Sequence, residues 1–373
     1  MPSAVCIGET MAMLTPRAAP LHEATELLFG IGGAESNVAM GLSSMGLPAH
    51  WIGRVGRDGF GTRILNDLRA HGVGTSGVEV DPVRPTGLYV KVPAVTPAGD
   101  PSVVVPADPG IGDKEGIGGR VGGPPVLGQA DGPAAGMSSV IYYRSGSAAS
   151  AMGPATLANP AVASLLREAA LIHLSGITAA LSEDCAELSR AILRAERKGR
   201  IISFDVNWRP ALWAGRDASI LAELANLADV VLMGRDEAEL AFGTDDESRL
   251  RRLLPDPEVL VIKNADISAT ALCRDGSRVD VPALRVEVVE PVGAGDAFAA
   301  GYLSGMALGL DQKSCLRRGH LSAASTLIVN GDRGALPPAH MVAAILAGSD
   351  EEWAAMRMMA GVEGAAAMPE EAP

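Results

Sequence analysis

Short apolar runs alternate along this chain with longer segments of helical periodicity, and this alternation limits the possible fold more than any other feature. Strand-like runs occupy residues 5–8, 51–55, 171–174, 201–206, 230–233, 259–263, 270–273 and 279–281. Helix-like segments occupy residues 36–45, 59–70, 182–198, 220–227, 297–308, 313–328 and 339–346. Buried strands separated by helices predict a doubly wound α/β fold, in which a mostly parallel sheet carries helices on both faces.

Two further strand-like runs, Thr86 to Val92 and Val140 to Arg144, stand outside this rhythm because no helix separates them. Antiparallel strands that interrupt an α/β domain often form a flap over its site. Between the two runs, Gly and Pro fill 18 of the 42 positions from 97 to 138. This density is typical of low-complexity sequence, so we expect a disordered insertion there.

Composition and charge exclude several classes of function. The net charge of −13 argues against a nucleic-acid partner, which requires a basic face. The four Cys form no CxxC pair, which fits reduced thiols and no zinc or disulfide site. Neither a signal peptide nor a membrane-length apolar run is evident, so we expect a cytoplasmic protein without a membrane partner.

The densest chemical signal is the segment Glu290–Gly301, where a turn of small residues runs directly into an apolar helix. Gly293 and Gly295 allow backbone N–H groups to converge on one point, and the helix N-terminus adds partial positive charge. This arrangement suits a phosphate. Asp296 then has two interpretations: a helix-capping residue, or a general base beside the phosphate. Neither a Walker A motif nor a dinucleotide fingerprint is present.

A second signal near the N-terminus places the pair Gly32-Gly33 and then Asn37 at the start of a helix. Alone it is a common turn. Together, and in this order about 260 residues apart, the two motifs resemble the signatures of the ribokinase-like, or PfkB, family of carbohydrate kinases. The resemblance covers residues 4–96 and 139–348.

The resemblance implies a ribokinase-like α/β kinase core with a small β lid. The core would comprise residues 1–12, 34–85 and 149–349, and the lid residues 13–33 and 86–148. Residues 350–373 would form an acidic tail. Trp353, Met356 and Met359 share one helical face in that tail, but its acidic and Ala-rich sequence favours fraying.

The resemblance also implies roles for residues that match the family motifs. Asp296 would be the catalytic base, and Gly33 and Asn37 would bind the sugar. Residues 293–295 (Gly293, Ala294 and Gly295) would form the anion hole. Lys263 would contact ATP, and Glu237 would contact both ATP and, through water, Mg²⁺.

Three positions on the nucleotide side depart from the family pattern. Gly234 replaces the Asn of an NxxE motif whose Glu is Glu237. Ala265 and Ser268 stand where relatives usually have Gly in the loop that touches the nucleotide.

Local strings resemble 2-keto-3-deoxygluconate kinases, in which residues matching Gly33, Tyr89, Tyr142, Arg144 and Arg209 contact the sugar acid. Two Arg suit a carboxylate, which an Arg fork binds bidentately. Met13 stands where ribose and fructose kinases typically carry an Asp. We therefore expect transfer of phosphate from ATP to the primary hydroxyl of a small sugar acid, 2-keto-3-deoxygluconate, to give its 6-phosphate.

Several alternatives remain open at this point. Arg144 could instead pair with a surface acid, Arg209 could pack on Trp208, and the two Tyr could belong to the lid core. The chain could phosphorylate another sugar such as fructose. It could also be a catalytically weak sugar- or nucleotide-binding protein, as Gly234, Ala265 and Ser268 suggest. By resemblance, a homodimer through the lid is expected.

Overall fold

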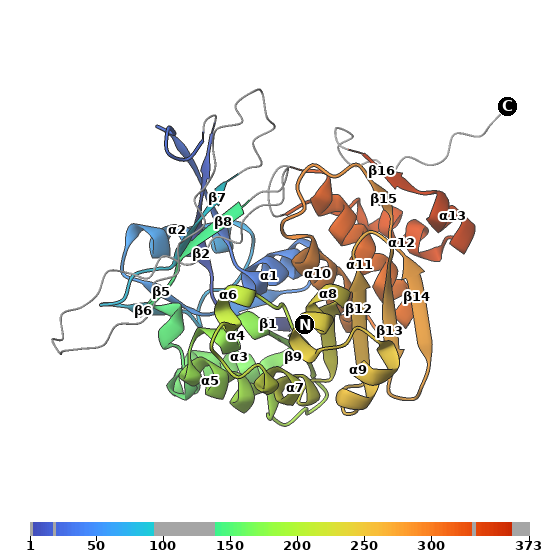
Figure 1. The fold of residues 1–373 in the computed structure, drawn as a ribbon, viewed down its shortest axis with the longest axis horizontal. Helices are drawn as coiled ribbons and strands as arrows, with labels where there is room; N and C mark the ends of the chain where they lie inside the picture. The colour runs from blue at the N-terminus through green and yellow to red at the C-terminus, as the bar shows by residue number, and fades with distance from the viewer. Residues whose placement is uncertain (1–2, 18–19, 93–138, 330–332, 360–373) are drawn as a thin grey trace, which may run out of the picture.

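An eight-stranded sheet organises the larger part of the chain in the computed structural model, which describes residues 3–17, 20–92, 139–329 and 333–359 (Figure 1). Its strands run in the order β14 (Arg278–Pro282), β13 (Ser268–Cys273), β12 (Val259–Asn264), β11 (Val230–Gly234), β10 (Ile201–Asp205), β9 (Ala169–Ser175), β1 (Ser3–Ile7) and β4 (Ala49–Ile52). The pairs from β12 to β4 are parallel, and β13 and β14 are antiparallel additions at one edge. The predicted doubly wound fold is confirmed.

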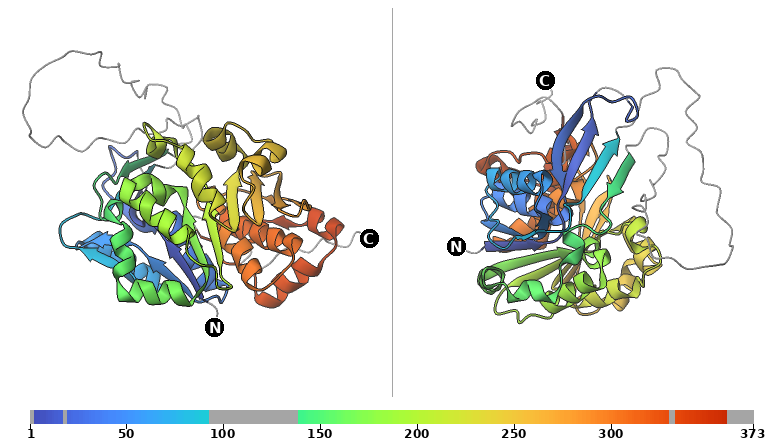
Figure 2. Two further views of the ribbon diagram at one scale, coloured as in Figure 1. Left: turned by 90° about the horizontal axis from the view of Figure 1, so that it is seen from below. Right: turned by 90° about the vertical axis from the view of Figure 1, so that its left-hand side faces the viewer.

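Helices cover both faces of this sheet (Figures 1 and 2). One face packs against α1 (Ala34–Ser44), α2 (Gly59–Ala70), α10 (Ala294–Ala307), α11 (Gln312–Leu327) and α12 (Ala339–Ala347). The other packs against α3 (Pro160–Glu168), α4 (Gly176–Leu181), α5 (Glu183–Leu193), α6 (Pro210–Trp213), α7 (Ser219–Asn226), α8 (Arg235–Phe242) and α9 (Glu247–Leu253). Strand residues alternate between these two cores, as in β1, where Ala4 and Cys6 face the first and Val5 and Ile7 the second.

A second, four-stranded sheet projects from the carboxyl edge of the core and is called the lid below (Figure 2). Its order is β3 (Leu27–Gly32), β2 (Met11–Pro16), β7 (Leu88–Val92) and β8 (Ser139–Tyr143). The expected strands at 86–92 and 140–144 are β7 and β8, and they pair antiparallel. The predicted insertion at 97–138 lies outside the described residues.

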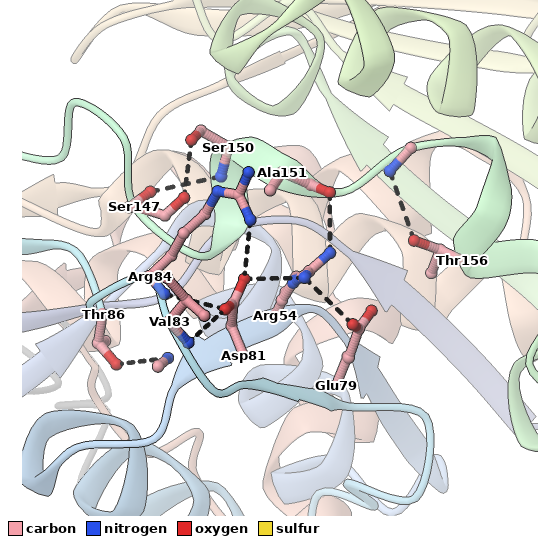
Figure 3. A network of polar contacts seen from close by, with 12 residues as sticks. Arg54, Glu79, Asp81, Val83, Arg84, Thr86, Ser147, Ser150, Ala151 and Thr156 are labelled. Atoms are coloured by element: carbon pink, nitrogen blue, oxygen red, sulfur yellow. Dashed lines mark hydrogen bonds and ion pairs between the residues drawn. The ribbon is translucent and has the colours of Figure 1, made fainter.

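The connections between lid and core are held by a polar network (Figure 3). It joins a two-stranded ribbon, β5 (Arg54–Gly56) with β6 (Glu79–Asp81), to a short 3₁₀ turn at Ala149–Ala151. In a second turn, Pro154–Ala158, the Thr156 hydroxyl accepts the Gly153 N–H at 3.4 Å. The Arg54 guanidinium lies 2.8 Å from the Asp81 carboxylate and donates to the Ala151 carbonyl at 3.0 Å. Backbone N–H groups of Arg84 and Val83 are the main reason that the pKa of Asp81 falls to about 2. The base of the lid is therefore fixed to the core.

Two sequence expectations about helices were wrong. The helix that begins after Ser182 ends at Leu193, not at Lys198, because the Arg197 guanidinium donates to the Leu193 and Ala195 carbonyls and turns the chain. The tail does not fray up to residue 358: Asp350–Ala355 forms α13, and β16 (Arg357–Met358) pairs with β15 (Arg285–Val286). Residues 360–373 lie outside the described residues. No described helix combines the length and apolar character of a membrane span.

Replacing Trp353 with Ala is expected to lower the free energy of unfolding by about 3 kcal/mol, because it empties a large buried site. Trp353 is 3% exposed, its indole N–H donates to the Pro282 carbonyl at 2.9 Å, and the Arg317 guanidinium lies 5.1 Å from its ring. Urea denaturation measures the change. Met359→Ala is the control, since this side chain is 49% exposed. A Trp353→Ala variant as stable as the control would show that the docked tail contributes nothing.

Candidate active site

A cleft of about 810 Å³ lies between the lid and the carboxyl ends of the core strands. In an open α/β sheet this edge is where ligands bind. The cleft collects the predicted site residues Gly33, Asn37, Tyr89, Tyr142, Arg144, Arg209, Glu237, Lys263, Gly293, Gly295 and Asp296. Ala294, the remaining predicted residue, begins α10 and does not line the cleft. Two motifs far apart in the sequence thus meet at one site.

The phosphate loop has the backbone geometry that its glycines predict. Gly293 is the N-cap of α10, with a left-handed φ of 86° that a side chain would strain. The first helical hydrogen bond runs from the Ala297 N–H to the Gly293 carbonyl at 2.9 Å. The N–H groups of residues 294–296 precede that bond and have no partner within the helix. Such N–H groups at a helix N-terminus are suited to bind an anion, and this point is called the anion site below.

Asp296 lies in the first turn of α10, and its carboxylate Oδ2 accepts a hydrogen bond from Asn37 Nδ2 at 2.8 Å. Burial is the main cause that raises the pKa of Asp296 to about 7; the Asn37 bond lowers it, and the Asp205 charge raises it further. A carboxyl group with this pKa is suited to accept a proton near neutral pH. Asn37 orients the group, a contact that the sequence did not predict.

We expect the kcat/KM of the natural chain to fall as the pH drops below about 7, where Asp296 becomes protonated. Asn37→Ala removes a hydrogen bond that favours the charged carboxylate. The acidic limb of the pH profile should therefore shift to higher pH by about one unit. Initial rates between pH 5 and 9 measure the shift. Asn226→Ala, on the far helix α7, is the control. An unmoved limb would contradict the assignment of this pKa to Asp296.

A charged cluster stands where strands β10, β11 and β12 end. Lys263 Nζ lies 3.1 Å from Asp205 Oδ2, and Glu237 Oε2 accepts the Gly234 N–H at 2.7 Å. Burial alone would lower the pKa of Lys263, but the negative charges of Asp205 and Glu237 more than offset it and raise the pKa. Burial is also the main cause that raises the pKa of Glu237. Lys263 therefore stays cationic close to Gly295 of the anion site.

The opposite end of the cleft carries Arg144 and two aromatic rings. The Arg144 guanidinium lies 5.4 Å from the Tyr142 ring, which is 5.8 Å from the Tyr89 ring. Arg144 donates to Glu9 Oε2, while Ser147 donates to the other oxygen of this buried carboxylate at 2.9 Å. The partner of Arg144 is thus a buried acid and not the surface acid that the sequence left open. Glu9 follows β1 without a motif around it.

Arg209 is the more accessible of the two cleft arginines. Its side chain is 45% exposed, and its Nη1 lies 3.5 Å from Glu237 Oε1. The neighbouring Trp208 ring stacks on Trp213 at 5.8 Å. Arg209 Nη1 also donates to the Trp208 carbonyl at 2.8 Å, and at this exposure the guanidinium is accessible to a ligand in the cleft.

The nucleotide-side departures have a visible backbone consequence at one position. Ala265 has a left-handed φ of 46°, a conformation that Gly adopts without cost and that Ala adopts under strain. Ser268 instead begins β13 and pairs in register with Pro282. Gly234 lends only its backbone N–H, to Glu237. The loop keeps its turn despite the missing glycine.

The family follows from comparison with known proteins. The profile of the pfkB family carbohydrate kinases matches residues 1–105 and 134–338. This chain belongs to the pfkB family. The resemblance of its two motifs is thereby confirmed, and the chain is a phosphotransferase that acts on a sugar hydroxyl.

Individual relatives and a solved structure are also similar to this chain. A 2-dehydro-3-deoxygluconokinase from Bacillus subtilis is 32% identical over 92% of this chain and 95% of its own length. Another from Thermoproteus tenax is 31% identical, over 90% of this chain and 92% of its own. The structure of a Pyrococcus horikoshii sugar kinase in complex with ATP shares the fold, with a TM-score of 0.67 and 22% identity over 88% of this chain and 93% of that one.

Proposed function

We propose that this pfkB kinase transfers the γ-phosphoryl group of ATP to the primary hydroxyl of 2-keto-3-deoxygluconate, the same sugar acid as 2-dehydro-3-deoxygluconate. The observation that carries the proposal is that Arg144 and Arg209 line the cleft that holds Asp296 and its anion site. A carboxylate needs fixed cationic donors, which a neutral sugar does not. The two relatives named for this substrate support the same choice.

In the proposed reaction the sugar acid lies beneath the lid with its carboxylate toward Arg144 and Arg209. Gly33, Tyr89 and Tyr142 shape its pocket. Asp296 accepts the proton of the primary hydroxyl while that oxygen bonds to the γ-phosphorus. The bond from this phosphorus to the β–γ bridging oxygen breaks, and ADP leaves. N–H groups at the start of α10 stabilise the charge that develops on the transferring phosphoryl group.

ATP would enter as its magnesium complex on the side of Lys263 and Glu237. Among the described residues, no group of three or more His, Cys, Asp or Glu is placed to hold a metal ion by itself. Mg²⁺ keeps several waters and is usually held by one or two carboxylates together with substrate phosphates. Glu237 and Asp205 would contact its waters, and Lys263 would neutralise phosphate charge. A homodimer through the lid stays a prediction.

A coupled assay of ADP release across sugar acids and neutral sugars tests the function. We expect turnover with 2-keto-3-deoxygluconate and ATP, with the phosphate on the 6-hydroxyl by ³¹P NMR. Faster turnover of fructose or another neutral sugar would show that this sugar, and not 2-keto-3-deoxygluconate, is the substrate. The absence of sugar-dependent ADP release for every sugar would favour a binding protein over an enzyme.

A further inference from the structure

An ion pair crosses from the lid to the loop that precedes the anion site. Lys91 stands in lid strand β7, and its Nζ lies 3.1 Å from Glu290 Oε2 in the core. The Lys91 side chain is 7% exposed and that of Glu290 17%. Neither is a member of the catalytic cluster described above. An ion pair this far from solvent is weakly screened, and the loss of one partner leaves the other charge poorly solvated.

The Glu290 carboxylate also contacts the start of the phosphate loop. Its second oxygen, Oε1, accepts the backbone N–H of Val292 at 3.2 Å, one residue before Gly293. The backbone N–H groups of Glu290 and Val289 donate to the Leu327 carbonyl at 3.2 and 2.8 Å, at the end of α11. The backbone of Glu290 is thus fixed to the core. Its carboxylate bridges a lid lysine on one side and the anion-site loop on the other.

We propose that Lys91 and Glu290 are positioning residues that couple the seating of the lid to the shape of the anion site. With Lys91 in place, the Glu290 carboxylate is held where it fixes the Val292 N–H, and the N–H groups at residues 294–296 face the phosphoryl group. Without Lys91, the carboxylate turns toward water and releases the Val292 N–H. Phosphoryl transfer then proceeds with a misplaced anion site, which lowers kcat.

The coupling rests on phosphoryl transfer at this site and not on which sugar is accepted. Lys91 also lines the cleft, so a direct contact with the sugar acid is the competing interpretation. The two differ in a measurable way. A sugar contact would raise the KM for the sugar and would not involve Glu290. A positioning role lowers kcat, and the effects of substituting Lys91 and Glu290 are then not additive.

The test compares Lys91→Met, Glu290→Gln and the double variant. All are assayed with ATP and whichever sugar of the panel the natural chain phosphorylates best. We expect each single variant to lower kcat by about 10- to 100-fold, with a sugar KM within about threefold of the natural value. The double variant should be no slower than the slower single variant. Lys91→Arg, which keeps the cation opposite Glu290, should lose less kcat than Lys91→Met.

Two controls keep the result interpretable. Glu223→Gln breaks a comparable ion pair with Arg190, far from the cleft, and should leave kcat unchanged. Melting temperatures and calorimetric affinities for the sugar and ADP show whether each variant is folded and binds its ligands. A raised sugar KM in Lys91→Met beside a normal Glu290→Gln would overturn the proposal, as would losses in kcat that add up in the double variant.

Discussion

Replacing Asp296 with Asn is expected to lower kcat by about 10³-fold or more, because the amide cannot accept the hydroxyl proton. The amide is isosteric with the carboxyl group, and its oxygen can still accept the hydrogen bond from Asn37 Nδ2. Shape and ligand binding should therefore persist while proton transfer is lost. Steady-state assays measure kcat, and calorimetry measures the affinities for sugar and nucleotide.

The same variant makes a prediction about stability whose sign follows from the pKa. Folding raises the pKa of Asp296 from its ordinary value to about 7, so the folded chain holds this proton more tightly than the unfolded chain. The carboxyl group therefore costs stability as the pH rises through this window, and the full cost is present above pH 7. Asp296→Asn should accordingly melt at a higher temperature than the natural chain at pH 8.

Asp184→Asn is the matched control, since Asp184 is an exposed acid in the first turn of α5 and does not line the cleft. It should leave kcat unchanged and should not raise the melting temperature, because an acid in the first turn of a helix is favoured by the helix dipole. An Asp296→Asn variant that keeps phosphorylating the sugar would remove Asp296 from the role of base. A capping role alone would then remain, the other interpretation that the sequence allowed.

The features that the sequence predicted are those with a short-range signal. The periodicities of strands and helices are visible in windows of about ten residues. The sequence therefore predicted the layers of the core. The turn that begins α10 followed because Gly293 permits the left-handed backbone at its N-cap. Each of these features depends on neighbours in the chain and not on distant partners.

The features that the sequence missed depend on contacts between distant segments. Glu9 and Lys91 are single charged residues whose partners lie far along the chain, and no local pattern marks either. The Asn37–Asp296 hydrogen bond joins residues 259 positions apart. Trp353 carries a signal in its apolar spacing, but the acidic residues around it favour a frayed tail. The Trp353 ring contacts β14 and α11, which lie at other points of the sequence.

Arg209→Ala should lower the kcat/KM for the sugar acid by about 100-fold, since two charge-assisted hydrogen bonds to a carboxylate are lost. For a neutral sugar the change should stay within about threefold, because no carboxylate is left unpaired. Arg235→Ala is the control: its side chain is 42% exposed and has one acidic partner, as Arg209 does, but it lies outside the cleft. Equal losses for acidic and neutral sugars would contradict a carboxylate contact.

Arg144 gives the complementary case, because its charge is already balanced by Glu9. A buried neutral pair attracts an anion less than a free guanidinium does, so most of the attraction should come from Arg209. Arg144, fixed between Glu9 and the Tyr142 ring, would instead set the orientation of the carboxylate. Arg144→Lys keeps the charge but loses the planar fork. It should therefore lower kcat more than it raises KM, whereas Arg209→Ala should act mainly on KM.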